Sequence, residues 1–238
     1  MYMPSAFRED RVEVQHELMR AHPLGLLIIH GPDGLDANPL PFMLYPDESR
    51  LGVLRAHFSR ANPLTRQLPQ AAQCLVVFQG PHQYITPSWY ATKRETGKVV
   101  PTWNYATVHA WGAPRLMDDA AWLRRHLDDM TRSREAGRTP PWEIADAPPG
   151  YIDAQLRAII GLEISITRTQ GKWKASQNRP QADREAVVAG LLAEGPPDNP
   201  MIAMVAERAN IAPPPRQPAD RQPDAKAADP GRKAPGRD

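Results

Sequence analysis

Hydrophobic residues recur along this chain in short runs, and glycine, proline and aspartate stand between the runs. The stretch Gly31–Gly34, for example, has the sequence GPDG, which is a strong turn signal between two such runs. Short runs separated by turns favour an antiparallel sheet that closes on itself, rather than a chain in which strands and helices alternate. The pattern predicts strands over residues 24–30, 38–45, 51–58, 74–79, 105–111 and 161–169.

Details within these runs predict where each strand lies in the sheet. Residues 74–79 form the most apolar run, so we expect that strand to be central. In residues 105–111, aromatic or polar side chains alternate with alanine and valine, which is typical of a half-buried strand. Pro39 and Pro41 cannot donate ladder hydrogen bonds, so their strand is expected at an edge or a bulge.

Helical spacing of hydrophobic residues is confined to a few segments at the periphery of the predicted sheet. We predict helices over residues 11–21, 118–131, 185–192 and 199–209. From residue 211 onward the chain is rich in proline, alanine and charged residues and has no hydrophobic period. The sequence therefore predicts a domain over residues 1–210 and a disordered tail over residues 211–238.

Composition narrows the class of protein without identifying a partner. The formal net charge is +2 and the arginines are scattered, which does not by itself indicate nucleic-acid binding. Cys74 is the only cysteine, which excludes an intramolecular disulfide and a multi-cysteine zinc site. No segment approaches the ~20 apolar residues of a membrane span, and the N-terminus lacks the features of a signal peptide. We expect a cytoplasmic protein without a membrane partner or a metal site.

Two tryptophan-bearing segments in mid-chain carry the strongest chemical signal. They are YITPSWY at residues 84–90 and VPTWNY at residues 100–105. Both combine flat rings with hydroxyl and amide groups, and His82, Lys93 and His109 lie nearby, which suggests a planar, anionic ligand. The alternative is that each tryptophan fills a core and its indole N–H finds a carbonyl.

Two further polar segments fit an anionic ligand. In HFSRANP, at residues 57–63, a strand runs into a predicted helix start, where Arg60 and exposed backbone N–H groups would suit a phosphate. The alternative there is a simple helix cap with a surface arginine. In KWKASQNRP, at residues 172–180, hydrogen-bond donors follow the last predicted strand, and the alternative is a solvated loop.

The order and wording of these segments resemble the PaiB family of FMN-binding negative transcriptional regulators. That family belongs to the flavin split-barrel group, which also contains the pyridoxamine-phosphate oxidases. The resemblance covers about the first 200 residues. It rests on MYMP with Phe7, LDANPLPF at 35–42, HFSRANP, FQGPHQYITPSWY at 78–90, VVPTWNY at 99–105, and WKASQNRP at 173–180.

The resemblance implies a mainly β protein with peripheral helices, built on a six-stranded, antiparallel, Greek-key-like split barrel. It also implies a homodimer with FMN between the subunits. Arg60 would contact the phosphate. Related oxidases place a lysine after that arginine, whereas this chain has Ala61, so the phosphate would be bound more weakly, or Lys93 or Lys174 would supply the missing charge. Carried over by position, the cofactor-binding candidates are His57, Ser59, Arg60, Asn62, Ser88, Trp89, Tyr90, Lys93, Thr102, Trp103, Asn104, Lys174, Ser176 and Gln177.

Three functions from different classes remain open. The resemblance favours a flavin-linked negative regulator of transcription, although no helix-turn-helix or basic recognition helix supports direct DNA binding. The second function is a flavin-dependent reductase or oxidase of a small substrate, for which His57, His82 and His109 are the only titratable candidates within the motifs. The third is a sensor that binds FMN, another flavin or haem without turnover.

Overall fold

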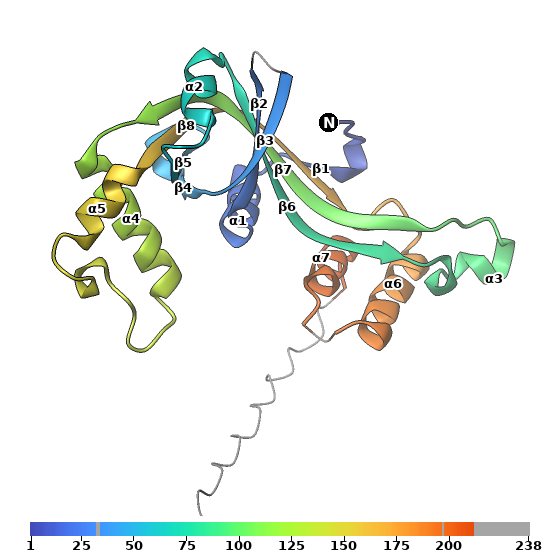
Figure 1. Cartoon of the computed structure of the whole chain (residues 1–238). Coiled ribbons are helices and arrows are strands. Elements are labelled where there is room, and N and C mark those ends of the chain that lie inside the picture. The colour runs from blue at the N-terminus through green and yellow to red at the C-terminus, as the bar shows by residue number, and fades with distance from the viewer. Residues whose placement is uncertain (32–33, 197, 212–238) are drawn as a thin grey trace, which may run out of the picture.

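The computed structural model describes residues 1–31, 34–196 and 198–211 of the chain (Figure 1). Almost all of the tail predicted to be disordered therefore lies outside the described residues. The helices are α1 (Val12–Ala21), α2 (Leu64–Gln67), α3 (Thr92–Thr96), α4 (Ala120–Glu135), α5 (Tyr151–Ala158), α6 (Gln181–Glu194) and α7 (Pro200–Ala209). The strands are β1 (Arg8–Glu9), β2 (Leu24–Gly31), β3 (Gly34–Pro41), β4 (Met43–Tyr45), β5 (Val53–Ser59), β6 (Cys74–Ile85), β7 (Thr102–Met117) and β8 (Ile159–Lys174).

All eight strands belong to one antiparallel sheet with the order β3-β2-β6-β7-β8-β5-β4, and β1 pairs with β8 beside this path. Six of the strands are long, and β1 and β4 are short additions of two and three residues. The expected antiparallel split barrel is confirmed. The edge position expected for Pro39 and Pro41 is also confirmed, because their strand β3 stands at one end of the order.

One face of the sheet forms the core, which explains the alternation in the sequence. On β7, Ala106, Val108 and Ala110 are at most 1% exposed and pack into the main core, whereas His109 and Trp111 lie on the opposite face. The core is closed by α1 and by the buried sides of α6 and α7. We call the core side of the sheet its inner face and the other side its outer face.

The strands β6, β7 and β8 extend beyond the barrel and carry helices at both of their ends (Figure 1). At one end, α4 and α5 form a small second core built on Trp122, Leu123 and Leu156. At the other end lie α3, α6 and α7. Register shifts between Gln79 and His82 and between Trp111 and Gly112 interrupt the ladders of this long ribbon.

Several predicted boundaries were wrong. The strand expected over residues 38–45 is divided at Phe42, whose ring turns into the core. The strands expected at 74–79, 105–111 and 161–169 are all longer, because their polar ends still pair along the ribbon. Lys172, Trp173 and Lys174 therefore belong to the last strand, although they were expected to follow it. Helix α5 was not predicted.

Membrane-spanning helices and metal-ligand clusters are both absent from the described ranges. None of the helices they contain has both the length and the hydropathy needed to cross a bilayer. Within the same ranges, no group of three or more histidine, cysteine, aspartate or glutamate residues lies close enough to hold a metal ion.

The helix α4 is attached to the sheet through a buried histidine pair. The ring of His126 stacks on Trp122 at 5.3 Å and meets the ring of His57 at 5.4 Å. Neither ring nitrogen of His126 has a hydrogen-bond partner, and burial lowers the pKa of His126 to about 4. Arg55 lowers this pKa further, and Asp129 opposes the shift. Burial also lowers the pKa of His57, so both imidazoles are neutral in the folded protein near pH 7.

This pair predicts a loss of stability in mild acid. The unfolded chain binds a proton on His126 near pH 6.5 and the folded chain does not, so folding is disfavoured as the pH falls. Between pH 6.5 and pH 5 the free energy of unfolding is expected to drop by up to about 2 kcal/mol. Urea unfolding at pH 7.5 and pH 5.0 measures this. In the variant His126→Phe, which keeps a ring against Trp122, most of the drop should vanish, and an unchanged drop would contradict the assignment.

Candidate functional site

The segment expected to bind phosphate lies where β5 ends. The backbone turns at Arg60, whose N–H donates to the carbonyl of Ala158 at 2.9 Å, and the N–H of Asn62 then donates to the carbonyl of Ser59 at 2.9 Å. The Asn62 side-chain oxygen accepts from the N–H of Leu64 at 2.9 Å, at the start of α2. The predicted helix start is therefore correct, although α2 is only four residues long.

Arg60 offers its guanidinium at the surface and is paired with Asp118. Its Nη1 donates to Oδ2 of Asp118 at 3.0 Å, and Nη2 donates to Oδ1. This pairing lowers the pKa of Asp118. Nothing in the sequence pointed to Asp118, because it is 58 positions away and meets Arg60 only through the fold. His57, by contrast, lies under α4 against His126 and not with the donors of Arg60.

The first tryptophan segment lies at the far end of β6. Trp89 donates its indole N–H to Oε1 of Glu194 at 2.8 Å and packs so closely on Gly190 that a β-carbon there would lie 2.3 Å from the indole. Tyr90 is 2% exposed, and its ring lies 4.7 Å beneath the guanidinium of Arg179. Trp89 therefore packs against α6 and Tyr90 packs in the main core, which agrees with the core-filling alternative considered for single tryptophans.

Side chains from the start of β7 and the end of β8 are tied together. Asn104 is fully buried and donates its amide to the hydroxyl of Ser176 at 2.9 Å. Ser176 has φ 61°, in the left-handed region that L-residues rarely adopt, and this bond helps to hold it there. Gln177 accepts from the N–H of Ala175 at 2.6 Å. Lys174 donates to the carbonyl of Trp103 at 2.6 Å and to the hydroxyl of Thr102.

Trp103 differs from Trp89 because its ring is open to solvent. It is 53% exposed on the outer face, 6.0 Å from the ring of Tyr84 and 6.2 Å from that of His82. Ser88 and Lys93 are also exposed here, and the ammonium of Lys93 donates to the Ser88 hydroxyl at 3.2 Å. This end therefore presents a flat ring and cations to a ligand.

The structure divides the candidate residues into two groups at opposite ends of the same sheet. Ser59 pairs with Ile159 at the start of β8, whereas Tyr105, which follows Trp103 and Asn104, pairs with Lys174 at its end. At about 3.3 Å per residue, the 15 steps between these two ends of β8 correspond to about 50 Å along the strand. One FMN molecule is too short to reach both groups within one chain.

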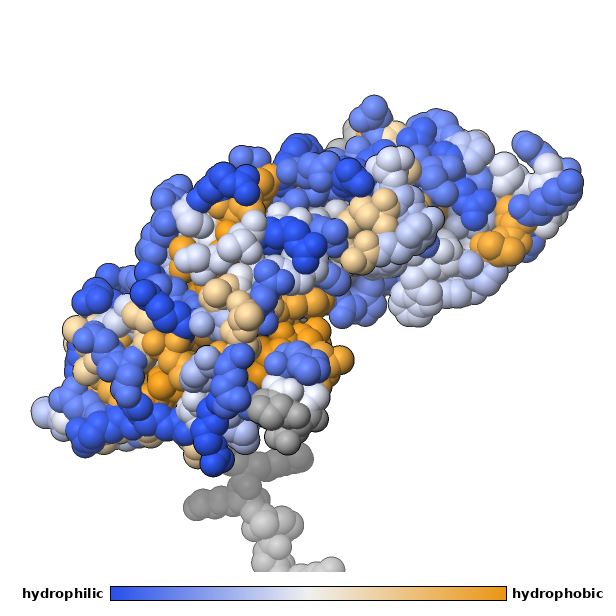
Figure 2. Space-filling view, turned by 90° about the horizontal axis from the view of Figure 1, so that it is seen from above, coloured by the Kyte–Doolittle hydropathy of each residue, from blue (hydrophilic) through white to orange (hydrophobic). Residues whose placement is uncertain are grey.

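An apolar area of the outer face lies between the two groups. Leu26 opposes Val77, and Ile28 opposes Leu75, so that these four side chains share the outer face. Trp111 lies beyond Leu75 on the next strand. Leu26 is 38% exposed. Figure 2, seen from above, shows several hydrophobic patches in one half of the molecule, with hydrophilic residues between and around them.

A separate cleft of about 440 Å³ lies between the far end of β6 and the helices α6 and α7. Its lining includes Ser88 and Trp89 but none of the residues around Arg60. This cleft therefore does not join the two groups.

The donors around Arg60 fit a phosphate group. The guanidinium is a planar fork that matches phosphate oxygens, the Ser59 hydroxyl accepts from Ala61 and keeps its own hydrogen to donate, and the Asn62 amide nitrogen is separate from the oxygen used as a cap. At the other end, the open ring of Trp103 fits a flat heterocycle. The chain therefore has suitable groups for both ends of FMN.

Comparison with known proteins gives the same cofactor and fold. Residues 1–168 match the family described as "Putative FMN-binding domain". A protein of Emericella nidulans is 34% identical over 226 residues, covering 80% of this chain and 90% of that protein. Protease synthase and sporulation protein PAI 2 of Bacillus subtilis is 29% identical over 207 residues, covering 87% of this chain and 95% of that protein.

The solved structure of the flavocytochrome Anf3 from Azotobacter vinelandii superposes with a TM-score of 0.55 at 16% identity, covering 70% of this chain and 69% of that one. This likeness supports the split-barrel fold. Because the family match spans most of the chain, the protein belongs to the family of FMN-binding domains and is a flavin-binding split-barrel protein of the PaiB type.

Proposed function

We propose that FMN binds between two copies of this chain, with Arg60 of one copy at the phosphate and Trp103 of the other copy beside the ring. The observation that carries this proposal is the separation of the two groups of candidate residues along β8. Neither group is a complete site alone. A second copy, turned about a two-fold axis, would bring the Arg60 end of one chain to the Trp103 end of the other.

The apolar area of the outer face supports this second copy. Leu24 and Leu26 are 66% and 38% exposed, and Val77, Leu75 and Trp111 continue the area across β6 and β7. Large contiguous apolar surfaces mark sites where proteins bind partners or ligands. It lies between the two groups, so that a dimer formed there would use both ends of both chains.

In the proposed site each residue has a limited task. Arg60, Ser59 and Asn62 bind and orient the phosphate. To reach the guanidinium of Arg60, the phosphate would displace the carboxylate of Asp118. Trp103 of the other copy covers the ring and excludes water from it. FMN supplies the electron-transfer chemistry when it is bound, and the protein supplies position and electrostatics.

The role proposed for the flavoprotein is negative regulation of transcription. The 29% identity to Protease synthase and sporulation protein PAI 2 over most of both chains supports it. Helix α7 is a poor candidate for DNA recognition, because most of its residues are buried and Arg208 is bound to Glu9. Regulation would then depend on another surface of the dimer or on a further protein.

A flavin-dependent oxidoreductase is the second candidate, favoured by the open ring of Trp103 and the lysines beside it. Two measurements on the FMN-loaded protein separate the candidates. Salt-sensitive retardation of a promoter fragment, without bleaching of the flavin by nicotinamide nucleotides, supports the regulator. Rapid bleaching by a nicotinamide nucleotide, without retardation of any fragment, would replace the regulator by the enzyme.

A further inference from the structure

Three cationic side chains lie together on the outer face, where β1 meets β8. Arg8 is directly opposite Lys172 in the ladder, and Lys174 is two positions further along β8. Residues two apart on a strand share a face and are separated by about 7 Å. Like charges opposite each other in a sheet are destabilising. The arrangement therefore calls for a compensating negative charge.

No carboxylate supplies this charge within the described part of the chain. None of the ion pairs there includes Arg8, Lys172 or Lys174. The neighbouring carboxylate of Glu9 is buried and is bound to Arg11 and Arg208. Lysines that are almost fully buried are usually paired.

The lack of a paired carboxylate is significant because Lys172 is buried and Lys174 is partly buried. Lys172 is only 8% exposed, and its ammonium donates to one neutral group, the carbonyl of Tyr2 at 3.1 Å. Lys174 donates to the Trp103 carbonyl and the Thr102 hydroxyl, which are also neutral. Desolvation, with the charges of Lys172 and Arg179, lowers the pKa of Lys174. An ammonium keeps further donors free for an anion in this setting.

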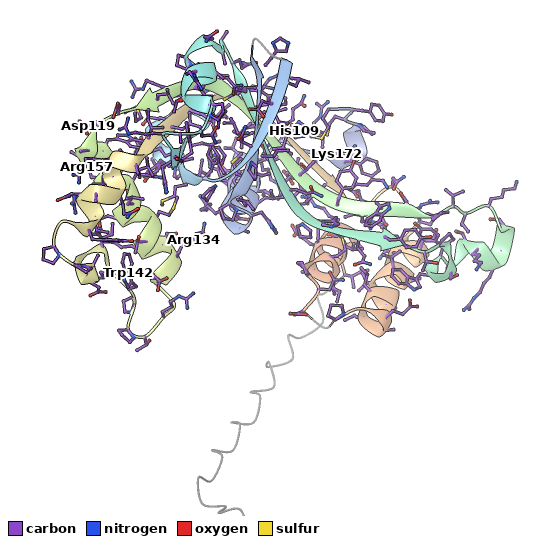
Figure 3. The ribbon with its side chains drawn as sticks, viewed as in Figure 1. His109, Asp119, Arg134, Trp142, Arg157 and Lys172 are labelled. Atoms are coloured by element: carbon purple, nitrogen blue, oxygen red, sulfur yellow. The ribbon has the colours of Figure 1, made fainter. Side chains whose placement is uncertain are left out.

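Aromatic rings surround the cations. The Lys172 ammonium lies 5.3 Å from the centre of the Tyr105 ring and 5.8 Å from that of Tyr2. Figure 3 shows Lys172 and His109 on the ribbon of β7 and β8, on the side where the N-terminal segment lies. Trp103 adds an open ring beyond Lys174. A ligand that met the cations would therefore also meet flat apolar surface.

We propose that Lys172 and Lys174, with Arg8, bind a small organic anion that carries a flat ring, such as an aromatic carboxylate or an aryl phosphate ester. The cations would hold the anionic group, and the rings of Tyr105 and Tyr2, which lie beside the Lys172 ammonium, would contact its ring. Binding of this anion is independent of FMN. We also infer that this anion lies against the flavin. That step rests on the proposed function, because only a dimer brings this end of one chain to the Arg60 end of another.

Calorimetric titration of the flavin-free, full-length protein with phenyl phosphate tests the site. We expect saturable binding that is weakened roughly tenfold or more by Lys172→Gln and by Arg8→Gln, since each removes one charge-assisted contact. Arg8 is exposed, so its substitution tests the site even if Lys172→Gln does not fold. The matched control is Lys98→Gln. Lys98 is an exposed lysine between α3 and β7, and this variant should bind phenyl phosphate as tightly as the parent protein does. Inorganic phosphate, which has no ring, should bind more weakly than phenyl phosphate.

Four results would overturn the proposal. They are no saturable binding, equal weakening by Lys98→Gln, tighter binding of a short single-stranded oligonucleotide than of phenyl phosphate, and displacement of phenyl phosphate by FMN in equimolar amount. The last would show that these cations serve the flavin phosphate. Failure of the proposed dimer site looks different: Arg60→Ala would then leave FMN binding unchanged, whatever phenyl phosphate does.

Discussion

Replacing Leu26 by aspartate is expected to convert the protein from a dimer into a monomer and to remove FMN from it. Leu26 lies in the centre of the apolar outer face, beside Val77 and Ile28. In the proposed dimer this position is covered by the other copy, and a carboxylate there would be desolvated without a partner. Sedimentation equilibrium is expected to show monomer at micromolar concentration, and FMN affinity should fall by roughly 100-fold or more.

The matched control is Leu192→Asp on α6. Leu192 is 42% exposed, close to the 38% of Leu26, but it lies on a helix away from the outer face. This variant should remain dimeric and bind FMN normally. Circular dichroism would verify that both variants fold. A dimeric, FMN-binding Leu26→Asp protein would show that the copies meet elsewhere.

Replacing Arg60 by alanine is expected to lower FMN affinity by about 1.5–3 kcal/mol, which is roughly 10- to 150-fold. The reason is the loss of a charge-assisted, forked contact to the phosphate. Riboflavin has no phosphate, so its affinity should change little in the same variant. Quenching of flavin fluorescence on titration measures both affinities.

The ion pairs of the chain offer controls for this change. Arg124 is also an exposed arginine paired with one aspartate, Asp153, and Arg124→Ala should leave FMN affinity unchanged. Asp118→Asn removes the carboxylate that occupies Arg60 and should raise FMN affinity a few-fold. If Arg60→Ala and Arg124→Ala bind FMN equally well, Arg60 is not the phosphate contact.

The parts of this fold that the sequence predicted are those set by local pattern. Alternation along β7 separated the inner residue Val108 from the outer residue His109, and the amphipathic spacing around Trp122 predicted α4. The run of polar residues after β5 predicted the turn at Arg60. In each case the side chains that decide the structure are neighbours in the chain.

Features that depend on distant pairing could not be predicted in this way. Asp118 meets Arg60, and Arg8 lies opposite Lys172, only because of the register of β1, β5, β7 and β8. The polar residue His82 interrupts the apolar pattern, so the extension of β6 was missed, although its backbone still pairs with β7. That extension is what places Trp103 so far from Arg60.

Complementation between two inactive variants tests the shared site most directly. Arg60→Ala and Trp103→Ala change exposed side chains at opposite ends of the sheet, and each variant alone should bind FMN weakly. After subunit exchange in an equal mixture, half of the dimers carry both variants, and one of their two sites has Arg60 from one copy and Trp103 from the other. About a quarter of all sites should then bind FMN with the parent's affinity. If FMN binding in the mixture stays at the level of the separate variants, each site is built from a single chain and the account is contradicted.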